Sequence, residues 1–320
     1  MNETRSLGDG ADTDPLLSVD DLSVAFHTDK ERIHALDGVS FDIHEGETVG
    51  LVGESGSGKS VTARSLLGLV DDPGRIESGS IRFRGEELTE VGWADARGDV
   101  AIVFQDPSGS LNPVYTVGNQ IREALLLHQD LTGKAAREEA IRLLESVGIP
   151  DAPRRVDAYP NEFSGGMRQR AVIATALACD PDLLVCDEPT TALDVTIQAQ
   201  ILDLLAELQR EQGLAILFIT HDMGVVSQVA DRVNVMYAGE IVERAPADRL
   251  FANPAHPYTR GLLASIPSVR EADEELLTID GDNLDAHLSQ LTIDHMISGD
   301  AAFPTVLFAL IENPVYFLGG

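Results

Sequence analysis

The sequence predicts an α/β fold with a parallel central sheet, and two observations support this prediction. Short apolar runs, typical of buried strands, alternate with helix-length amphipathic segments along most of the 320 residues. One of these runs, residues 48–52, is followed by the pattern G-x-x-x-x-G-K-S at residues 53–60 and then by a helical segment at 61–67. This strand–loop–helix order is the context in which the pattern forms a phosphate-binding loop.

The glycine-rich pattern supplies the chemistry that a phosphate group needs. Gly53, Gly56 and Gly58 permit positive φ angles, so successive N–H groups can turn inward around an anion. The following helix directs the positive end of its dipole at the same point. Lys59 is expected to reach the β- and γ-phosphates of a nucleotide, and Ser60 to place a hydroxyl on Mg²⁺. The predicted nucleotide-binding residues are Gly53, Glu54, Ser55, Gly56, Ser57, Gly58, Lys59, Ser60 and Val61.

The composition is strongly acidic. The chain has 53 acidic and 23 basic residues, a formal net charge of −30, and lysine only at positions 30, 59 and 134. A surface of this charge repels nucleic acid and anionic lipid. It also repels itself at low salt, which favours adaptation to a high-salt cytoplasm. An acidic, solvated surface without this meaning is the alternative.

The sequence predicts neither export nor a membrane span. The two cysteines, Cys179 and Cys186, form neither a metal-type pair nor a disulfide framework. The acidic, polar N-terminus does not resemble a secretion signal, and no run of 18 or more apolar residues occurs.

The first third of the chain is predicted to form the loop's strand and an antiparallel side sheet. Residues 1–15 are polar and acidic and are expected to be a disordered tail. Apolar and polar residues alternate at 16–26 and again at 34–43, and a short strand is expected at 81–85.

The middle of the chain is predicted to be mainly helical. An apolar strand at 100–104 ends in Gln105, and a helical subdomain is expected from about residue 106 to 178. Its main helices are predicted at 121–128, 135–147 and 167–178, the last with Ser164 as N-cap.

The remaining part returns to alternating strands and helices. Strands are predicted at 183–186, 215–220, 231–236 and 240–243, with a helix at 197–209. A helix is expected to begin near His256 and to stop at Pro267. The apolar stretch 303–318 is too short and too interrupted to span a bilayer.

Two carboxylates follow the strand at 183–186. Asp187 stands where a strand-end carboxylate can orient Mg²⁺, and Glu188 can polarise an attacking water. By itself, an Asp-Glu pair after a strand is often only a polar strand end. Its place about 130 residues after the glycine-rich loop, and before Pro189-Thr-Thr-Ala-Leu-Asp194, favours the catalytic interpretation.

At this point the sequence resembles the ATP-binding cassette (ABC) family, a P-loop NTPase family with a RecA-like core. Phe163-Ser-Gly-Gly-Met-Arg-Gln169 is similar to the family signature, and Ala192-Leu-Asp194 to its D-loop. Gln105 matches the Q-loop glutamine, His221 the switch histidine, and Phe26 the aromatic residue that stacks on adenine. Taken singly, these residues have ordinary alternatives: a turn glutamine, a flexible Ser-Gly-Gly loop, a capped turn histidine and a core aromatic.

The resemblance implies that two cassettes pair head to tail, so that the signature of one closes over the phosphate loop of the other. A second ABC ATPase subunit, identical or paralogous, is then the first partner. The resemblance implies catalytic roles for Lys59, Gln105, Glu188 and His221. It implies that Mg²⁺ is bound by Ser60, Gln105 and Asp187. It adds further ATP-binding residues, namely Phe26, Ser164, Gly165, Gly166, Met167 and Asp194.

The segment Pro254-Ala-His-Pro-Tyr-Thr-Arg-Gly-Leu-Leu263 resembles the oligopeptide, dipeptide and nickel importer branch of this family. The implied organisation is an ATPase domain at 16–250 and an importer-type extension at 251–320. The implied function is ATP-driven import of di- or oligopeptides, nickel or a related solute. The partners would be transmembrane permeases and, indirectly, an extracellular solute-binding protein, but no nucleic acid. The chain would lie peripherally at the cytoplasmic face of the cell membrane.

The end of the chain departs from that branch, which usually continues with a cysteine-rich tail. No cysteine follows Cys186, and the sequence is atypical after about residue 282, so no iron–sulfur cluster is expected. A soluble ABC ATPase without a transport role is the alternative function, and an inactive binding module is a third. The carboxylate at 188 and the histidine at 221 argue against the inactive module.

Overall fold

The computed structural model describes residues 14–265, apart from 29, 94–95, 97 and 192. The predicted acidic tail lies outside the described residues except for its last two positions. The stretch after residue 265, including the predicted stop at Pro267 and the atypical tail, lies outside them as well. The chain divides into two compact units, residues 1–259 and 260–320. The fold and the site described below belong to the first unit, except for residues 260–264 at the end of the last helix, which belong to the second.

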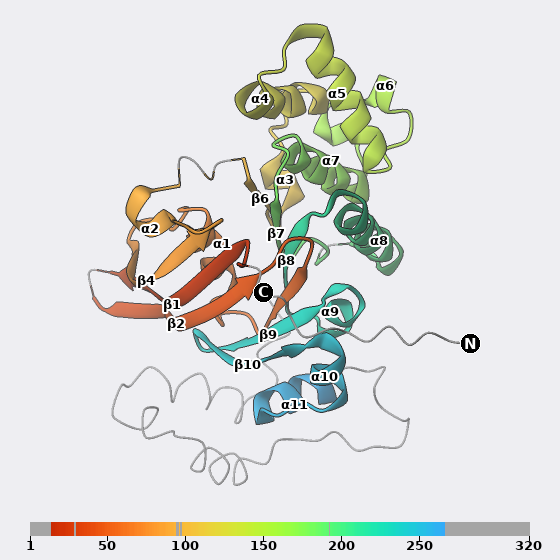
Figure 1. Cartoon of the computed structure of the whole chain (residues 1–320). Helices are drawn as coiled ribbons and strands as arrows, with labels where there is room; N and C mark the ends of the chain where they lie inside the picture. Colours follow the sequence, from red (N-terminus) through yellow and green to blue (C-terminus); the bar gives the residue numbers. More distant parts are fainter. Residues whose placement is uncertain (1–13, 29, 94–95, 97, 192, 266–320) are drawn as a thin grey trace, which may run out of the picture. The chain divides into compact units, whose positions relative to one another are not determined.

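The predicted antiparallel side sheet is present (Figure 1). Its strand order is β2-β1-β4-β5, and every neighbouring pair is antiparallel. The strands are β1 (Leu17–His27), β2 (Arg32–Ile43), β4 (Gly74–Phe83) and β5 (Glu86–Glu87). β4 begins seven residues before the predicted start at Ile81, because its first half pairs with the end of β1 although it lacks regular apolar alternation.

The second sheet has six strands in the order β10-β9-β3-β8-β7-β6. It is parallel except at its edge, where β10 pairs antiparallel with β9. β3, β7 and β8 are buried along their whole length, which explains why their sequences are continuous apolar runs instead of alternating patterns. The strands are β3 (Thr48–Val52), β6 (Val100–Val103), β7 (Leu183–Asp187), β8 (Ala215–Thr220), β9 (Arg232–Tyr237) and β10 (Glu240–Pro246).

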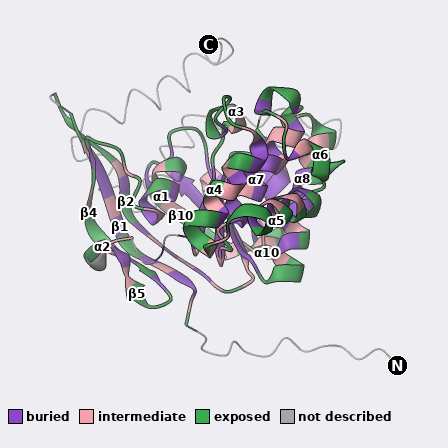
Figure 2. Cartoon of the chain, turned by 90° about the horizontal axis from the view of Figure 1, so that it is seen from above, coloured by how far each residue is buried: buried purple, intermediate pink, exposed green. Residues whose placement is uncertain are grey.

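Helices α1, α7 and α9 contact strands of this sheet, α2 contacts β4 of the side sheet, and α4, α5 and α7 form a helical layer by packing on one another. Figure 2 shows the buried residues concentrated on the strands and on the inner faces of the helices. The helices are α1 (Lys59–Leu66), α2 (Leu88–Val91), α3 (Pro107–Ser110), α4 (Val117–Gln129), α5 (Gly133–Ser146), α6 (Ala152–Arg155), α7 (Gly165–Leu177), α8 (Val195–Gln212), α9 (Met223–Val229), α10 (Ala247–Ala252) and α11 (Pro257–Ala264), with a 3₁₀ turn at Pro160–Glu162.

One continuous apolar core joins the two sheets through α1. It includes Leu17, Phe41, Leu51, Leu66 and Leu217, each of which is almost fully buried. Burying one such side chain contributes roughly 1.5–3 kcal/mol to stability. The core therefore fixes β3 and α1, and with them the loop that connects the two.

Candidate functional site

The glycine-rich loop connects the buried strand β3 to helix α1, as predicted. Gly56 and Gly58 have φ angles of +82° and +105°, a region that side chains disfavour. Gly53 does not have a positive φ, so that part of the prediction is wrong. It must be glycine for another reason: a Cβ there would lie 2.1 Å from the Met236 carbonyl oxygen and 2.7 Å from Ser57 Oγ. The end of β9 thus packs directly against the backbone of the loop at Gly53.

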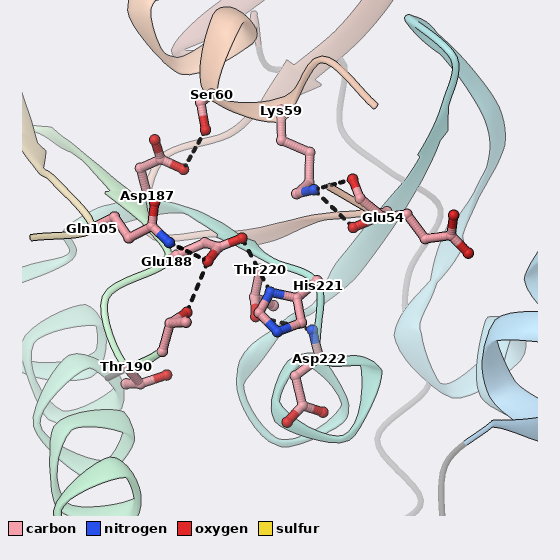
Figure 3. Close-up of polar contacts among 12 residues, drawn as sticks. Glu54, Lys59, Ser60, Gln105, Asp187, Glu188, Thr190, Thr220, His221 and Asp222 are labelled. Carbon is pink, nitrogen blue, oxygen red and sulfur yellow. Dashed lines mark hydrogen bonds and ion pairs between the residues drawn. The ribbon is translucent and has the colours of Figure 1, made fainter. Parts of the chain in front are cut away.

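Lys59 lies inside the loop and is only 5% exposed. Its ammonium group donates hydrogen bonds to the carbonyl oxygens of Gly53 at 2.8 Å and Glu54 at 2.7 Å (Figure 3). Burial lowers the pKa of Lys59, and the nearby carboxylates of Glu188, Asp187 and Glu54 partly offset this effect. A partly desolvated cation held by neutral carbonyl groups is well suited to bind an anionic phosphate.

Asp187 ends β7 and meets the first turn of α1. Ser60 Oγ donates a hydrogen bond to Asp187 Oδ1 at 3.2 Å, although the two residues are 127 positions apart. Burial raises the pKa of Asp187, and the charge of Glu188 raises it further, whereas Ser60 and Lys59 act in the opposite direction. A hydroxyl and a carboxylate are oxygen ligands of the kind that Mg²⁺ prefers.

These two side chains fit a Mg²⁺ ion that also takes ligands from phosphates and water. Among the described residues, no three His, Cys, Asp or Glu side chains gather in a way that could hold a metal ion. Mg²⁺ commonly relies on one or two protein ligands plus substrate phosphates, so this arrangement suits it better than a metal that needs a complete protein cage.

Glu188 is held by three side chains at the carboxyl end of the sheet (Figure 3). Gln105 Nε2 lies 2.8 Å and Thr191 Oγ1 lies 2.9 Å from its Oε2, and His221 Nδ1 lies 3.1 Å from its Oε1. Gln105 was predicted to contact Mg²⁺ as well, but in this structure its amide bonds Glu188. Thr191 is a member of the cluster that the sequence reasoning missed; its position three residues after Glu188 is the only local signal for it.

The signature segment lies in the helical layer, at the start of α7. Ser164 caps α7 as predicted, because its Oγ accepts a hydrogen bond from the Met167 N–H at 3.3 Å. Ser164 and Gly165 are exposed, whereas Gly166 packs closely against Ile197 of α8. Among the described residues, no hydrogen bond joins Ser164 to the glycine-rich loop of the same chain.

Asp194 and Phe26, which are also predicted to bind ATP, both make contacts within the chain. Asp194 caps α8 by accepting hydrogen bonds from the N–H groups of Thr196 and Ile197. Phe26 is half-buried near the end of β1, and its ring lies over Gly74 of β4, where a Cβ would be 2.7 Å from the ring. Ala192 of the predicted D-loop lies outside the described residues.

No helix in residues 14–265, gaps aside, combines the length and the hydrophobicity that crossing a bilayer requires. Comparison with solved structures finds ATP-binding cassettes. The dimeric cassette MJ0796, solved in a post-hydrolysis state bound to ADP and Pi, is 26% identical and gives a TM-score of 0.64 over 72% of this chain and 98% of that one. The cbiO1 protein from Clostridium perfringens, part of the complex cbiONQ, is 29% identical, with a TM-score of 0.65 over 75% of this chain and 92% of its own.

Comparison of sequences finds peptide transport proteins. Residues 36–191 match the ABC transporter family model, and residues 242–290 match the C-terminal region of oligopeptide/dipeptide transporters. A putative peptide import ATP-binding protein of Brucella abortus is 53% identical over 84% of this chain and 82% of its own length. The dipeptide transport ATP-binding protein DppD of Bacillus subtilis is 51% identical over 83% and 81%. The chain therefore belongs to the ABC transporter family, as an ATPase subunit that carries the loop, the two carboxylates and the histidine described above.

Proposed function

We propose that the chain hydrolyses ATP to drive the import of di- or oligopeptides through a membrane permease. The observation that carries the catalytic part is the position of Glu188, which three side chains orient at the carboxyl end of the sheet that also carries the phosphate loop. The relatives' names and the importer-type C-terminal region support the peptide cargo. The same similarities favour this function over the soluble, non-transport alternative.

The phosphate end of ATP binds at the loop. The backbone N–H groups at the start of α1, the dipole of that helix and the Lys59 ammonium together offset the charge of the β- and γ-phosphates. Ser60 and Asp187 would hold Mg²⁺, which when bound neutralises charge on the transferring phosphoryl group. Phosphoryl transfer needs little covalent chemistry from a protein, so positioning and electrostatic stabilisation account for most of the catalysis.

Glu188 and His221 act on the attacking water. The carboxylate of Glu188 can accept a proton from the water as it attacks, and His221, on the other side of that carboxylate, fixes its orientation. Gln105 and Thr191 hold the second oxygen of the carboxylate. Gln105 follows the strand β6 and precedes the helical layer, so nucleotide-dependent loss of its bond to Glu188 would be transmitted to the helices that face a permease.

The site is completed by a second cassette, identical or paralogous. The exposed Ser164 and Gly165 form an N–H-rich helix start, and within the described residues Ser164 makes no hydrogen bond to the glycine-rich loop of its own chain. Placed over the loop of a partner cassette, it supplies the second set of donors for the same triphosphate. ATP binding then closes the pair, and hydrolysis with product release opens it. The chain would lie at the cytoplasmic face of the membrane through its permease, which receives cargo from a solute-binding protein.

Affinity purification from detergent-solubilised membranes of the source cells tests the assembly. We expect the tagged full-length chain to bring permease subunits and a second cassette with it. Recovery with ribosomes or DNA, and without membrane proteins, would instead support the non-transport alternative.

Uptake assays test the cargo. Cells that lack the chain are complemented with wild-type protein or with Glu188→Gln, and uptake of a labelled dipeptide, a labelled pentapeptide and Ni²⁺ is measured. Peptide uptake should return only with the wild-type chain. Restoration of Ni²⁺ uptake alone would contradict the peptide assignment while leaving the ATPase assignment intact.

A further inference from the structure

One peptide group of the phosphate loop is held from both sides. The N–H of Glu54 donates a hydrogen bond to the phenolic oxygen of Tyr258 at 3.1 Å. The carbonyl of Gly53, in the same peptide group, accepts the hydrogen bond from Lys59 Nζ at 2.8 Å. In a trans peptide the N–H and C=O point in opposite directions. The two bonds therefore fix the rotation of this peptide plane, and Tyr258 keeps the carbonyl directed at Lys59.

Contacts that do not involve the loop fix the position of Tyr258. Its ring packs on the ring of Tyr237 at the end of β9, with 4.6 Å between the ring centroids. Its backbone N–H donates to His256 Nδ1 at 3.2 Å. The carboxylate of Glu243 in β10 accepts hydrogen bonds from the N–H groups of Ala255 and His256, at 2.7 and 2.9 Å. The segment 255–258 is thus anchored to the antiparallel edge of the main sheet.

The Tyr258 hydroxyl is suited to be a constant acceptor. Burial is the main cause that raises the pKa of Tyr258, to about 12, so the phenol stays neutral over the whole working range of pH. The side chain of Glu54 is exposed, and it is the backbone of Glu54 that meets the tyrosine. Replacing the phenol by phenylalanine would leave this loop N–H without its acceptor while keeping the ring against Tyr237.

We propose that Tyr258 is a positioning residue for Lys59, acting through the Gly53–Glu54 peptide, and that the segment after the cassette thereby tunes nucleotide affinity. This tyrosine lies outside residues 36–191, which match the general ABC family, and inside residues 242–290, which match the oligopeptide/dipeptide transporter region. The proposal rests on the proposed role of Lys59 as a phosphate ligand. It gives the start of the importer-type region a direct contact with the ATP site.

The test compares Tyr258→Phe with the matched control Tyr237→Phe in the full-length chain. Each variant removes one hydroxyl from the same aromatic pair, but only Tyr258 bonds the loop. Hydrogen exchange of the Glu54 amide, measured without nucleotide, should be about 2- to 10-fold faster in Y258F, as expected for the loss of one neutral hydrogen bond. The KM for ATP should rise by a similar factor with kcat within about twofold, because the lost interaction acts in binding. Y237F should match the wild type in both measurements.

The proposal would be overturned if Y258F left either the exchange rate of the Glu54 amide or the KM for ATP unchanged. It would also be overturned if Y237F changed both quantities as much as Y258F does. If Y258F melts well below the wild type, Tyr237→Leu provides a second route, because it removes the ring that orients Tyr258 and should change both readouts in the same direction. Lys59→Ala separates this inference from the function on which it rests. Wild-type ATP affinity in K59A would refute the role of Lys59, whereas unchanged exchange at Glu54 refutes only the role of Tyr258.

Discussion

Glu188 has a φ angle of +48°, which is uncommon for a residue that carries a side chain. Its N–H donates to the Ile219 carbonyl at 2.9 Å, and its carboxylate is held at both oxygens. Such conformations cost of order 1–3 kcal/mol and persist only where the surroundings determine them. Here the hydrogen bond to strand β8 and the three side chains around the carboxylate hold Glu188 in this conformation. The carboxylate is therefore already oriented to accept a proton from water.

The substitution Glu188→Gln tests whether the carboxylate of Glu188 is the group that activates water, because it replaces one carboxylate oxygen by an amide nitrogen. Glutamine has the same shape and can keep contacts with Gln105 and Thr191, but it cannot accept the proton of water. We expect phosphate release to fall at least about 100-fold, while ATP-dependent dimers persist on gel filtration. Glu145→Gln, which changes an exposed carboxylate of α5, should hydrolyse ATP at the wild-type rate. A monomeric E188Q that still turns over ATP would refute the role given to Glu188.

Lys59 leads to a prediction about pH. Burial holds its pKa below the ordinary value of 10.5, and ATP binds the protonated form. Affinity for ATP should therefore weaken about tenfold per pH unit once the pH exceeds the lowered pKa. Titration calorimetry between pH 7 and pH 10 measures this, and Lys134→Ala, an exposed lysine, is the control that should leave the profile unchanged.

Deprotonation of Lys59 would not itself promote unfolding at high pH. In the interval between the folded and the unfolded pKa of Lys59, the unfolded chain holds more protons than the folded chain. The contribution of this group to stability therefore rises with pH. A pH profile that is flat for ATP up to the ordinary value of 10.5 would contradict the buried ammonium as a phosphate ligand.

At the scale of elements, the two glycines that begin α7, Gly165 and Gly166, differ in how closely they approach α8. A Cβ on Gly166 would lie 2.5 Å from Ile197 Cγ2 of α8, whereas one on Gly165 would meet only Leu193 Cδ2 at 3.9 Å. Gly166→Ala should lower the unfolding free energy by about 1–3 kcal/mol, because α7 and α8 must separate. Gly165→Ala should be neutral or slightly stabilising, because alanine favours helix. Thermal melts without nucleotide measure both, and equal melting temperatures would contradict the close packing of α7 on α8.

Sequence patterns predicted the elements best where burial and periodicity agree. The strand at 48–52 was predicted to the residue, because a strand covered on both faces is a continuous apolar run. The seven-residue helix α9 was missed, since it is too short to display helical periodicity, although Asp222 caps it clearly. The bonds from Gln105 to Glu188 and from Tyr258 to Glu54 span 83 and 204 positions. No local pattern encodes such contacts, so only the folded chain could reveal them.

At the scale of the whole molecule, charge is the dominant property. A net charge of −30 on 320 residues produces repulsion within the folded chain. Many of the exposed arginines already pair with carboxylates, for example Arg82 with Asp20 and Arg137 with Asp157. Exposed pairs of this kind contribute little to stability, so they do not offset the destabilising repulsion among the excess carboxylates. We therefore propose that the protein is adapted to high salt.

Titration with KCl tests this adaptation. The screening length falls from about 10 Å at 0.1 M to about 3 Å at 1 M, so most of the repulsion should be relieved over that range. We expect the melting temperature to rise by about 5–10 °C, which for a chain of this size corresponds to roughly 3–7 kcal/mol. Sucrose provides the control, because it stabilises by exclusion from the surface and does not screen charge, and its effect should grow steadily with concentration. A melting temperature that does not change between 0.1 and 1 M KCl would mean that the acidic surface serves solubility alone.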